Sequence, residues 1–278
     1  MLNFIIGWFG IVISRYSAPD PEVITAETEL FTAPVGVETE VSLPVYRTVS
    51  WLKLIPNFLE DQKRIWLFPR RVLQGKYLLP LAAFVTAVFI FFAIDPYDPG
   101  YFRQSHLFLG FNTLVSGEHA TLFMTVVPLM FYAAGLLRRD DYMKQTSLFT
   151  LEAVLSAQLL TQILKGLGRR VRPVDVFTYA HFTDTWLRQK GPWWTGPGCF
   201  PSGHMIGATC VATVFAVRYR HHRWAPWVCY ALALTIGFSR VTLLSHFPSD
   251  VFAGAFLGYV ISSIVVLRQN TAQTSESE

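Results

Sequence analysis

Apolar residues gather in long, nearly uninterrupted runs, and polar residues are concentrated in the segments between those runs. A membrane-spanning helix needs roughly 20 mainly apolar residues. The pattern therefore predicts an all-α integral membrane protein, built as a six-transmembrane-helix bundle. The alternative that it leaves open is a soluble enzyme whose buried helices are apolar all round. The predicted spans are Tyr77–Ile94, Ala120–Leu137, Thr146–Leu164, Gly203–Val217, Ala225–Leu244 and Val251–Leu267.

The segments outside these runs differ from one another in composition. Met1–Ser14 is apolar but short and lacks a basic start, which favours an interfacial anchor over a seventh span or a secretory signal. Residues 15–50 are polar and predict a small hairpin or disorder. Trp51–Gln74 mixes large apolar with basic residues, as is typical of a helix on the inner membrane surface. The predicted organisation is an N-terminal extension over residues 1–76, a six-span domain over 77–268 and a disordered tail over 269–278.

Composition and charge support the membrane interpretation. Of the 278 residues, 52% are hydrophobic and 15% are charged, fewer charges than soluble domains carry. The net charge is +4. Basic residues gather before the first predicted span, between the second and third, between the fourth and fifth, and after the sixth. The positive-inside rule places these loops and both termini in the cytoplasm, so that loops 95–119, 165–202 and 245–250 face outward.

The outward loop 165–202 breaks the positive-inside rule, because it is rich in basic residues. These residues are either solvated charges or an anion-binding site. They are Lys165, Arg169, Arg170, Arg172, Arg188 and Lys190. Three short motifs lie at the outward ends of the predicted spans. The motifs are Lys165 with Arg172-Pro173, then Pro201-Ser202-Gly203-His204, then Ser239-Arg240 with His246 and Asp250. Arginine binds phosphate in a bidentate manner and lysine acts as a point charge. Lys165, Arg172 and Arg240 would thus give one pocket three cations.

A polar stripe leads up to the first motif. Gln158, Thr161 and Gln162 are spaced to share one helical face with Lys165. Polar residues inside a span usually face the bundle interior. The sequence therefore predicts that this face lines the site.

The second motif precedes a predicted span. Ser202 is a good N-cap, and a helix N-terminus offers free N–H groups to an anion. Gly203 allows close approach to the backbone, and His204 would stand in the first turn beside the bound anion. The other interpretation is an ordinary capped helix with an incidental histidine.

The third motif pairs a histidine with an acid. His246 and Asp250 are four residues apart, and Pro248 favours a helix start between them. Asp250 would reach one ring nitrogen of His246 and leave the other free to attack. The alternative is a surface histidine paired with a helix-start aspartate.

These motifs resemble the type-2 phosphatidic acid phosphatase superfamily, which includes membrane lipid phosphatases and vanadium haloperoxidases. The family pattern is matched at Lys165, Arg172, Pro173, Pro201, Ser202, Gly203, His204, Ser239, Arg240, His246 and Asp250. The resemblance covers about Tyr77 to Leu267 and places the phosphatase site at the outer-face helix ends.

The resemblance implies catalysis without a metal or cofactor. His246 would form a phosphohistidine, His204 would protonate the leaving oxygen, and Asp250 would orient His246. The phosphoryl oxygens would be held by Lys165, Arg172, Ser202, Gly203 and Arg240.

Other polar residues have simpler predicted roles. His119 is expected to cap a helix, and Glu152 to pair with Arg138 or Arg139 inside the membrane. The three cysteines, Cys199, Cys210 and Cys229, show no disulfide framework or metal spacing and are expected to be structural. The GxxxG spacings that begin at Gly203 and Gly254 would let the fourth and sixth spans pack closely.

The sequence thus predicts a lipid phosphatase in a bacterial inner membrane, with its site facing the periplasm. Its expected partners are a lipid phosphate and the bilayer, and not a nucleic acid. The resemblance favours undecaprenyl diphosphate as substrate, ahead of phosphatidylglycerol phosphate and phosphatidate. A lipid phosphotransferase, a vanadate-dependent haloperoxidase and a non-catalytic binding protein are the alternatives. The sequence leaves the oligomeric state open.

Overall fold

The computed structural model describes residues 46–47, 49–75, 78–176, 182–192, 195 and 198–267. The chain divides into two units, Met1–Pro44 and Val45–Glu278, and the described residues all belong to the second. The predictions for residues 1–45 and for the tail therefore lie outside the described ranges, and the domain boundaries at 76 and 268 stay predictions.

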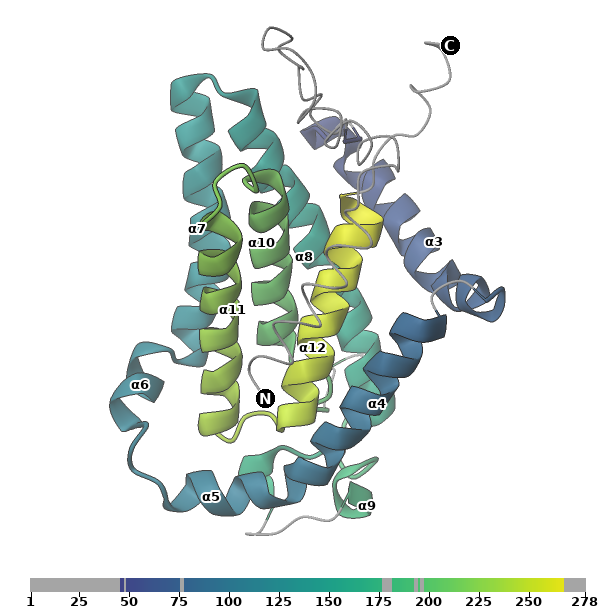
Figure 1. The fold of residues 1–278 in the computed structure, drawn as a ribbon, viewed down its shortest axis with the longest axis vertical. Helices are drawn as coiled ribbons and strands as arrows, with labels where there is room; N and C mark the ends of the chain where they lie inside the picture. Colours follow the sequence, from purple (N-terminus) through teal and green to yellow (C-terminus); the bar gives the residue numbers. More distant parts are fainter. Residues whose placement is uncertain are drawn as a thin grey trace, which may run out of the picture. The chain divides into compact units, whose positions relative to one another are not determined.

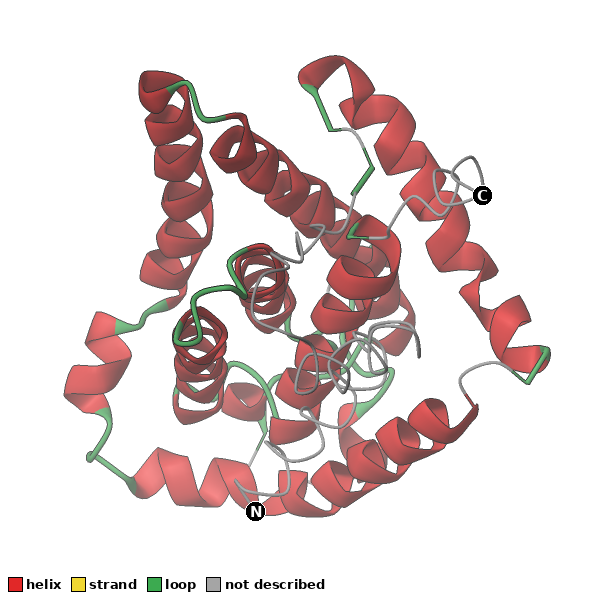
Figure 2. Ribbon diagram, turned by 45° about the horizontal axis from the view of Figure 1, so that its top comes forward, coloured by secondary structure: helices red, strands yellow, loops and turns green. Residues whose placement is uncertain are grey.

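Every regular element within the described ranges is a helix, and Figure 2 shows only helices and loops among the residues it colours. The all-α prediction is confirmed for this part of the chain. The α-helices are α3 (Leu54–Leu73), α4 (Leu78–Ile94), α5 (Asp98–Gln104), α6 (Leu109–Leu114), α7 (Gly117–Arg138), α8 (Asp141–Gly168), α9 (Phe182–Thr185), α10 (Gly203–Arg218), α11 (Ala225–Thr242) and α12 (Pro248–Val260). A π-helical turn, Ile261–Val266, follows α12.

Three segments among the described residues are long and apolar enough to cross a membrane: Leu78–Gln104, Gly117–Arg138 and Asp141–Asp175. Gly203–Arg218 is a shorter apolar helix. Only 6% and 11% of the first two windows are buried inside the protein, against 50% of the third, so α4 and α7 present most of their apolar surface outward. A membrane protein is therefore supported, while the count of six spans stays a prediction.

Helix α10 lies at the centre of the helix bundle and packs against α7, α8, α11 and α12 (Figure 1). Twelve of its sixteen residues are buried, and many of these are small: Gly, Ala, Thr and Cys. Membrane helices associate through small residues, because lipid offers no hydrophobic drive to bring helices together.

Two glycines of α12 allow its close contact with α10. A Cβ atom at Gly254 would stand 2.8 Å from the Ser202 carbonyl oxygen, and one at Gly258 would stand 2.6 Å from that of Ile206. The predicted glycine contact is thus confirmed on α12. On α10 the prediction is wrong, because a Cβ at Gly203 would meet Gln158 and Lys165 of α8, and one at Gly207 would meet Met124 of α7.

Helix α3 turns an acidic side chain toward the protein interior and several large apolar side chains outward. Asp61 is fully buried, whereas Ile55 and Leu59 are 72% and 62% exposed. Arg47 bonds both Asp61 and Glu152 at 2.6 Å, and Asn57 donates to Glu152 at 2.9 Å. The predicted pairing of Glu152 with Arg138 or Arg139 is therefore wrong. The partner of Glu152 is Arg47, which is 105 positions away in the chain. Inspection of the residues near the α7–α8 turn could not identify it.

Candidate active site

The three motif segments meet at one end of the bundle, which we call the site end. It holds the C-terminus of α8, the N-terminus of α10 and the turn from α11 to α12, at the bottom of Figure 1. The last residues of α4 and the short turn Asp95–Tyr97 lie at the same end. Residues from four separate parts of the chain are therefore brought together.

The start of α10 has the predicted cap and the predicted cation beside it. The Ser202 hydroxyl accepts from the Met205 N–H, although the distance is long at 3.5 Å. A Cβ atom at Gly203 would lie 3.8 Å from the Lys165 Nζ and 3.5 Å from Gln158 Oε1. Gln158 also donates to the Gly203 carbonyl at 3.0 Å. A positively charged amine thus stands at a helix N-terminus, an arrangement that favours an anion.

The polar stripe of α8 faces the site only in part. Gln158 contacts Gly203, and Thr161 is buried beside it. Gln162, by contrast, is exposed, so its predicted place on the lining is wrong. Its position is turned about 100° from that of Thr161 on the helix, enough to reach the outer surface.

His204 and Arg240 meet at the first turn of α7. The His204 Nε2 lies 3.2 Å from the Thr121 hydroxyl. A Cβ atom at Gly117 would stand 3.0 Å from Arg240 Nη1 and 3.7 Å from His204 Nε2. The Arg240 guanidinium also donates to Ser239 Oγ and to the Val115 carbonyl. Gly117 therefore provides the space in which the His204 imidazole and the Arg240 guanidinium lie.

His246 is buried next to these groups. Its backbone N–H donates to the Arg240 carbonyl at 3.2 Å. Burial lowers the pKa of the imidazole, the Asp250 carboxylate opposes this, and the positive charges of Lys165 and Arg172 lower it further. A neutral imidazole is the form that can act as a nucleophile.

His246 and Asp250 lie close together, as predicted, but no hydrogen bond joins them. The His246 Nδ1 lies 3.7 Å from Asp250 Oδ2, beyond hydrogen-bond distance. Within the described residues Nδ1 has no hydrogen-bond partner. Asp250 Oδ2 accepts instead from the Phe247 N–H at 3.0 Å and from the Cys199 thiol at 3.1 Å.

Arg170 is the strongest partner of Asp250, and the sequence analysis did not single it out from the basic loop. It is 1% exposed and bonds Asp250 Oδ1 at 2.5 Å and Asp95 Oδ2 at 2.6 Å. Its Nη1 donates to Ser249 at 2.7 Å, and its guanidinium stands 4.0 Å from the centre of the Phe247 ring. No local spacing separates Arg170 from the other basic residues of this loop, because Asp95 and Asp250 come from distant parts of the chain.

Arg172 is exposed, in contrast to Arg170. Both Arg172 and Lys165 are close enough to His246 to act on its charge state. Lys165 therefore lies near both Gly203 and His246, and the exposed Arg172 adds a second positive charge near His246.

Cys199, His246 and Asp250 place one potential ligand atom each within 4.8 Å of one another. Their chemistry does not suit a metal, because both Asp250 oxygens are already engaged by Arg170, Phe247 and Cys199. Burial also raises the pKa of the Cys199 thiol well above its ordinary value, and only the thiolate is a good metal ligand. The trio is better described as the surroundings of Asp250.

The fold and the site together define a helical membrane protein in which cations and two histidines lie near a capped helix start. The PAP2 superfamily model matches residues 146–273, a range that contains all the motif positions. The resemblance predicted from the motifs is therefore confirmed over this part of the chain.

Named relatives share parts of the same region. The chain is 30% identical over 130 residues to a lipid A 1-phosphatase of Rhizobium etli, covering 46% of this chain and 53% of the relative. It is 31% identical over 116 residues to phosphatidylglycerophosphatase B of Bacillus subtilis, covering 39% and 50%. It is 43% identical over 79 residues to glucose-6-phosphatase 3 of Bos taurus, covering 24% and 22%. The chain thus spans about half the length of the two bacterial relatives.

A solved structure is also similar, that of the transmembrane PAP2 type phosphatidylglycerolphosphate phosphatase from Bacillus subtilis. The match has a TM-score of 0.42 and 22% identity, and it covers 77% of this chain and 92% of that one.

Proposed function

We propose that this protein is a membrane lipid phosphatase that removes phosphate from a lipid phosphate or diphosphate through a phosphohistidine on His246. The observation that carries the proposal is the position of the buried His246 near Lys165 and 3.7 Å from Asp250, whose backbone carbonyl accepts the Ser202 N–H at the start of α10. Phosphoryl transfer needs mainly positioning and charge stabilisation, which these groups supply.

The proposed reaction has two steps. His246 Nε2 attacks phosphorus, the bond from phosphorus to the lipid oxygen breaks, and His204 gives that oxygen a proton. Water then attacks the phosphohistidine while His204 takes a proton from it, the bond from phosphorus to His246 breaks, inorganic phosphate leaves, and both histidines are restored. Lys165, Arg172, Arg240, Ser202 and the Gly203 N–H hold the phosphoryl oxygens throughout.

Asp250 and Arg170 have a separate role in this proposal. Asp250 places its charge 3.7 Å from His246 Nδ1 and so stabilises the imidazole as it becomes bonded to phosphorus. Arg170 holds the carboxylate in place.

Undecaprenyl diphosphate remains the substrate that we favour, on the resemblance alone. Two relatives are named for lipid A and for phosphatidylglycerophosphate, which makes both lipids necessary members of the test. We further propose six spans, with the site facing the periplasm of a bacterial inner membrane.

The test is phosphate release by the purified protein in detergent with EDTA. The substrates are undecaprenyl diphosphate, phosphatidylglycerol phosphate, phosphatidate and lipid A. We expect release from at least one lipid by the wild type and none by His246→Ala. His222→Ala, which changes a histidine of the α10–α11 turn, is the matched control and should keep full activity.

Two outcomes would change the assignment. Normal hydrolysis by His246→Ala would disprove the assignment of His246 as the nucleophile. Labelled phosphate that passes from His246 to a second lipid, and not to water, would make the protein a phosphotransferase.

A further inference from the structure

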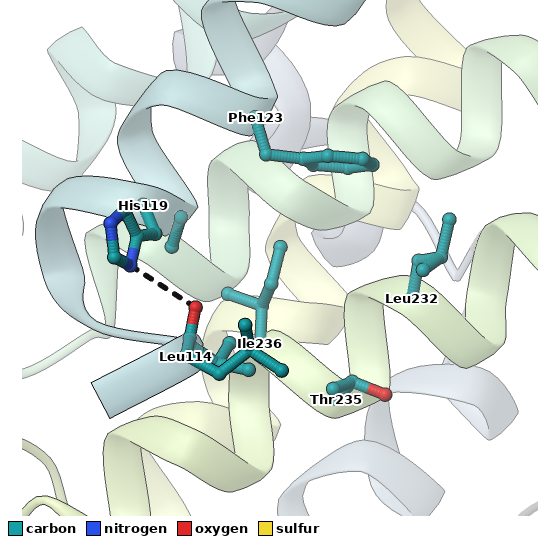
Figure 3. Close-up of a pocket in the computed structure, with 8 residues that line it drawn as sticks. Leu114, His119, Phe123, Leu232, Thr235 and Ile236 are labelled. Atoms are coloured by element: carbon teal, nitrogen blue, oxygen red, sulfur yellow. Dashed lines mark hydrogen bonds between the residues drawn. The ribbon is translucent and has the colours of Figure 1, made fainter. Parts of the chain in front are cut away.

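An apolar groove runs between the first turns of α7 and the middle of α11 (Figure 3). Its volume is about 250 Å³. Ala120 and Phe123 line it from α7, and Leu232, Thr235 and Ile236 line it from α11.

The groove continues directly from the candidate active site along α11. Leu232, Ile236 and Arg240 are four residues apart and therefore lie on one face of this helix. Arg240 stands at the site end, and Ile236 follows about 6 Å further along the axis. Val115, another lining residue, accepts a hydrogen bond from Arg240 through its carbonyl.

The same continuity is seen on α7. Gly117 and Thr121 face His204 and Arg240, as their contacts show. Ala120 and Phe123 face the groove. The first two turns of α7 thus border the phosphoryl site with one side and the groove with the neighbouring side.

The groove offers little to a polar ligand. Of its two polar side chains, Thr235 donates to the Ala231 carbonyl at 2.9 Å. His119 Nδ1 donates to the carbonyls of Thr113 and Leu114 at 3.2 and 3.1 Å. The His119 ring thus caps the end of α6, whereas the start of α7, the second predicted span, is capped by Ser116. Figure 3 shows the ring turned toward Leu114. The groove wall that remains is hydrocarbon.

We propose that this groove binds the hydrocarbon chain of the lipid phosphate at the segment next to the phosphate. The proposal rests on the function proposed above and deepens it. A phosphate held by Arg240 leaves the lipid chain at the mouth of the groove, one helical turn from Ile236. Leu114 and Leu232 are 74% and 43% exposed, so the chain would enter from the lipid side of the bundle. Binding of the chain here positions the phosphate against His246.

The test is to fill the groove with a large side chain. Thr235→Trp and Leu232→Trp, made singly, should each lower kcat/KM for the long-chain lipid phosphate on the order of tenfold, because a displaced chain misplaces the phosphate. Leu234→Trp is the matched control, since Leu234 is 50% exposed on the same helix and does not line the groove. It should behave as the wild type.

Inorganic vanadate, a phosphate analogue without a chain, reports on the phosphoryl pocket alone. Its inhibition constant should stay within about twofold of the wild-type value in all three variants. Wild-type kcat/KM in both groove variants would overturn the groove assignment. An equal loss of vanadate affinity would also overturn it, because the substitutions would then have damaged the phosphoryl pocket. If the wild type itself hydrolyses no lipid phosphate, the proposed function fails instead.

Discussion

Arg170 and Arg47 are both buried, and each bonds two carboxylates, but the residues next to those carboxylates differ. Arg170 bonds two carboxylates, Asp95 and Asp250, and Arg47 bonds two others, Asp61 and Glu152. Both guanidinium groups are at most 5% exposed. Asp250, however, adjoins His246, whereas Glu152 lies thirteen residues before Lys165 on α8, about 20 Å along its axis.

The comparison separates stability from catalysis. Removing a buried arginine from between two acids destabilises the fold, because it leaves uncompensated charge in a nonpolar interior. In the Arg170 cluster (Arg170, Asp95 and Asp250), Asp250 also lies beside His246, the candidate nucleophile, so we expect this cluster to affect catalysis as well. The Arg47 cluster (Arg47, Asp61 and Glu152) joins the segment before α3 to α8 and has no candidate catalytic residue beside it among the described residues.

The largest effect is expected at the Arg170 cluster. Arg170→Met should lower kcat on the order of 100-fold, since Asp250 would lose its position beside His246. It should also destabilise the protein by about 3–5 kcal/mol, because Asp95 and Asp250 stay buried. Lipid phosphatase assays and thermal unfolding in detergent measure the two effects. Arg188→Met, at an exposed arginine of the same loop, is the control. Unchanged kcat in folded Arg170→Met would show that Asp250 needs no positioning.

Arg47→Met tests the other half of the comparison. It leaves Asp61 and Glu152 buried without their cation and should cost a similar 3–5 kcal/mol of stability. Its kcat per folded molecule should stay within about twofold of wild type, because the cluster does not touch the site. Thermal unfolding and active-site-normalised turnover check this. A loss of turnover comparable with that of Arg170→Met would mean that the two clusters are coupled through α8.

A smaller effect concerns pH. His246 must be neutral to attack, so kcat/KM falls as the pH drops through its pKa, which lies below the ordinary value. Lys165 is one of the charges that lower this pKa. Lys165→Met should therefore raise it and move the acid side of the kcat/KM profile to higher pH, with some activity remaining at the optimum. Lys165→Arg keeps the charge and should keep the profile. An acid limb that does not move in Lys165→Met would argue that another group titrates there.

Sequence pattern alone predicted the helices well. The six apolar runs correspond to α4, α7, α8, α10, α11 and the stretch from α12 to residue 266, with boundaries within a few residues except at the start of α8, five residues early. Such runs are a local signal, since each depends only on consecutive side chains. The cap at Ser202 and the helix start at Pro248 are equally local.

The motif residues were also recognisable from their order, and the structure brings Lys165, Gly203, His204, Arg240 and His246 to one end of the bundle. The partners of buried charges were not recognisable. Asp250 is held by Arg170 more closely than by His246, and Glu152 pairs with Arg47 across 105 positions of the chain.

The sequence by itself thus determined the class of elements, their approximate limits and the identity of the candidate site residues. Only the tertiary structure decided which arginine meets which acid, and where a groove lies beside the phosphoryl pocket. The physical reason is that apolar periodicity and helix capping depend on neighbours in the chain. Buried ion pairs and cavities depend on which distant helices pack together, and no local pattern encodes that.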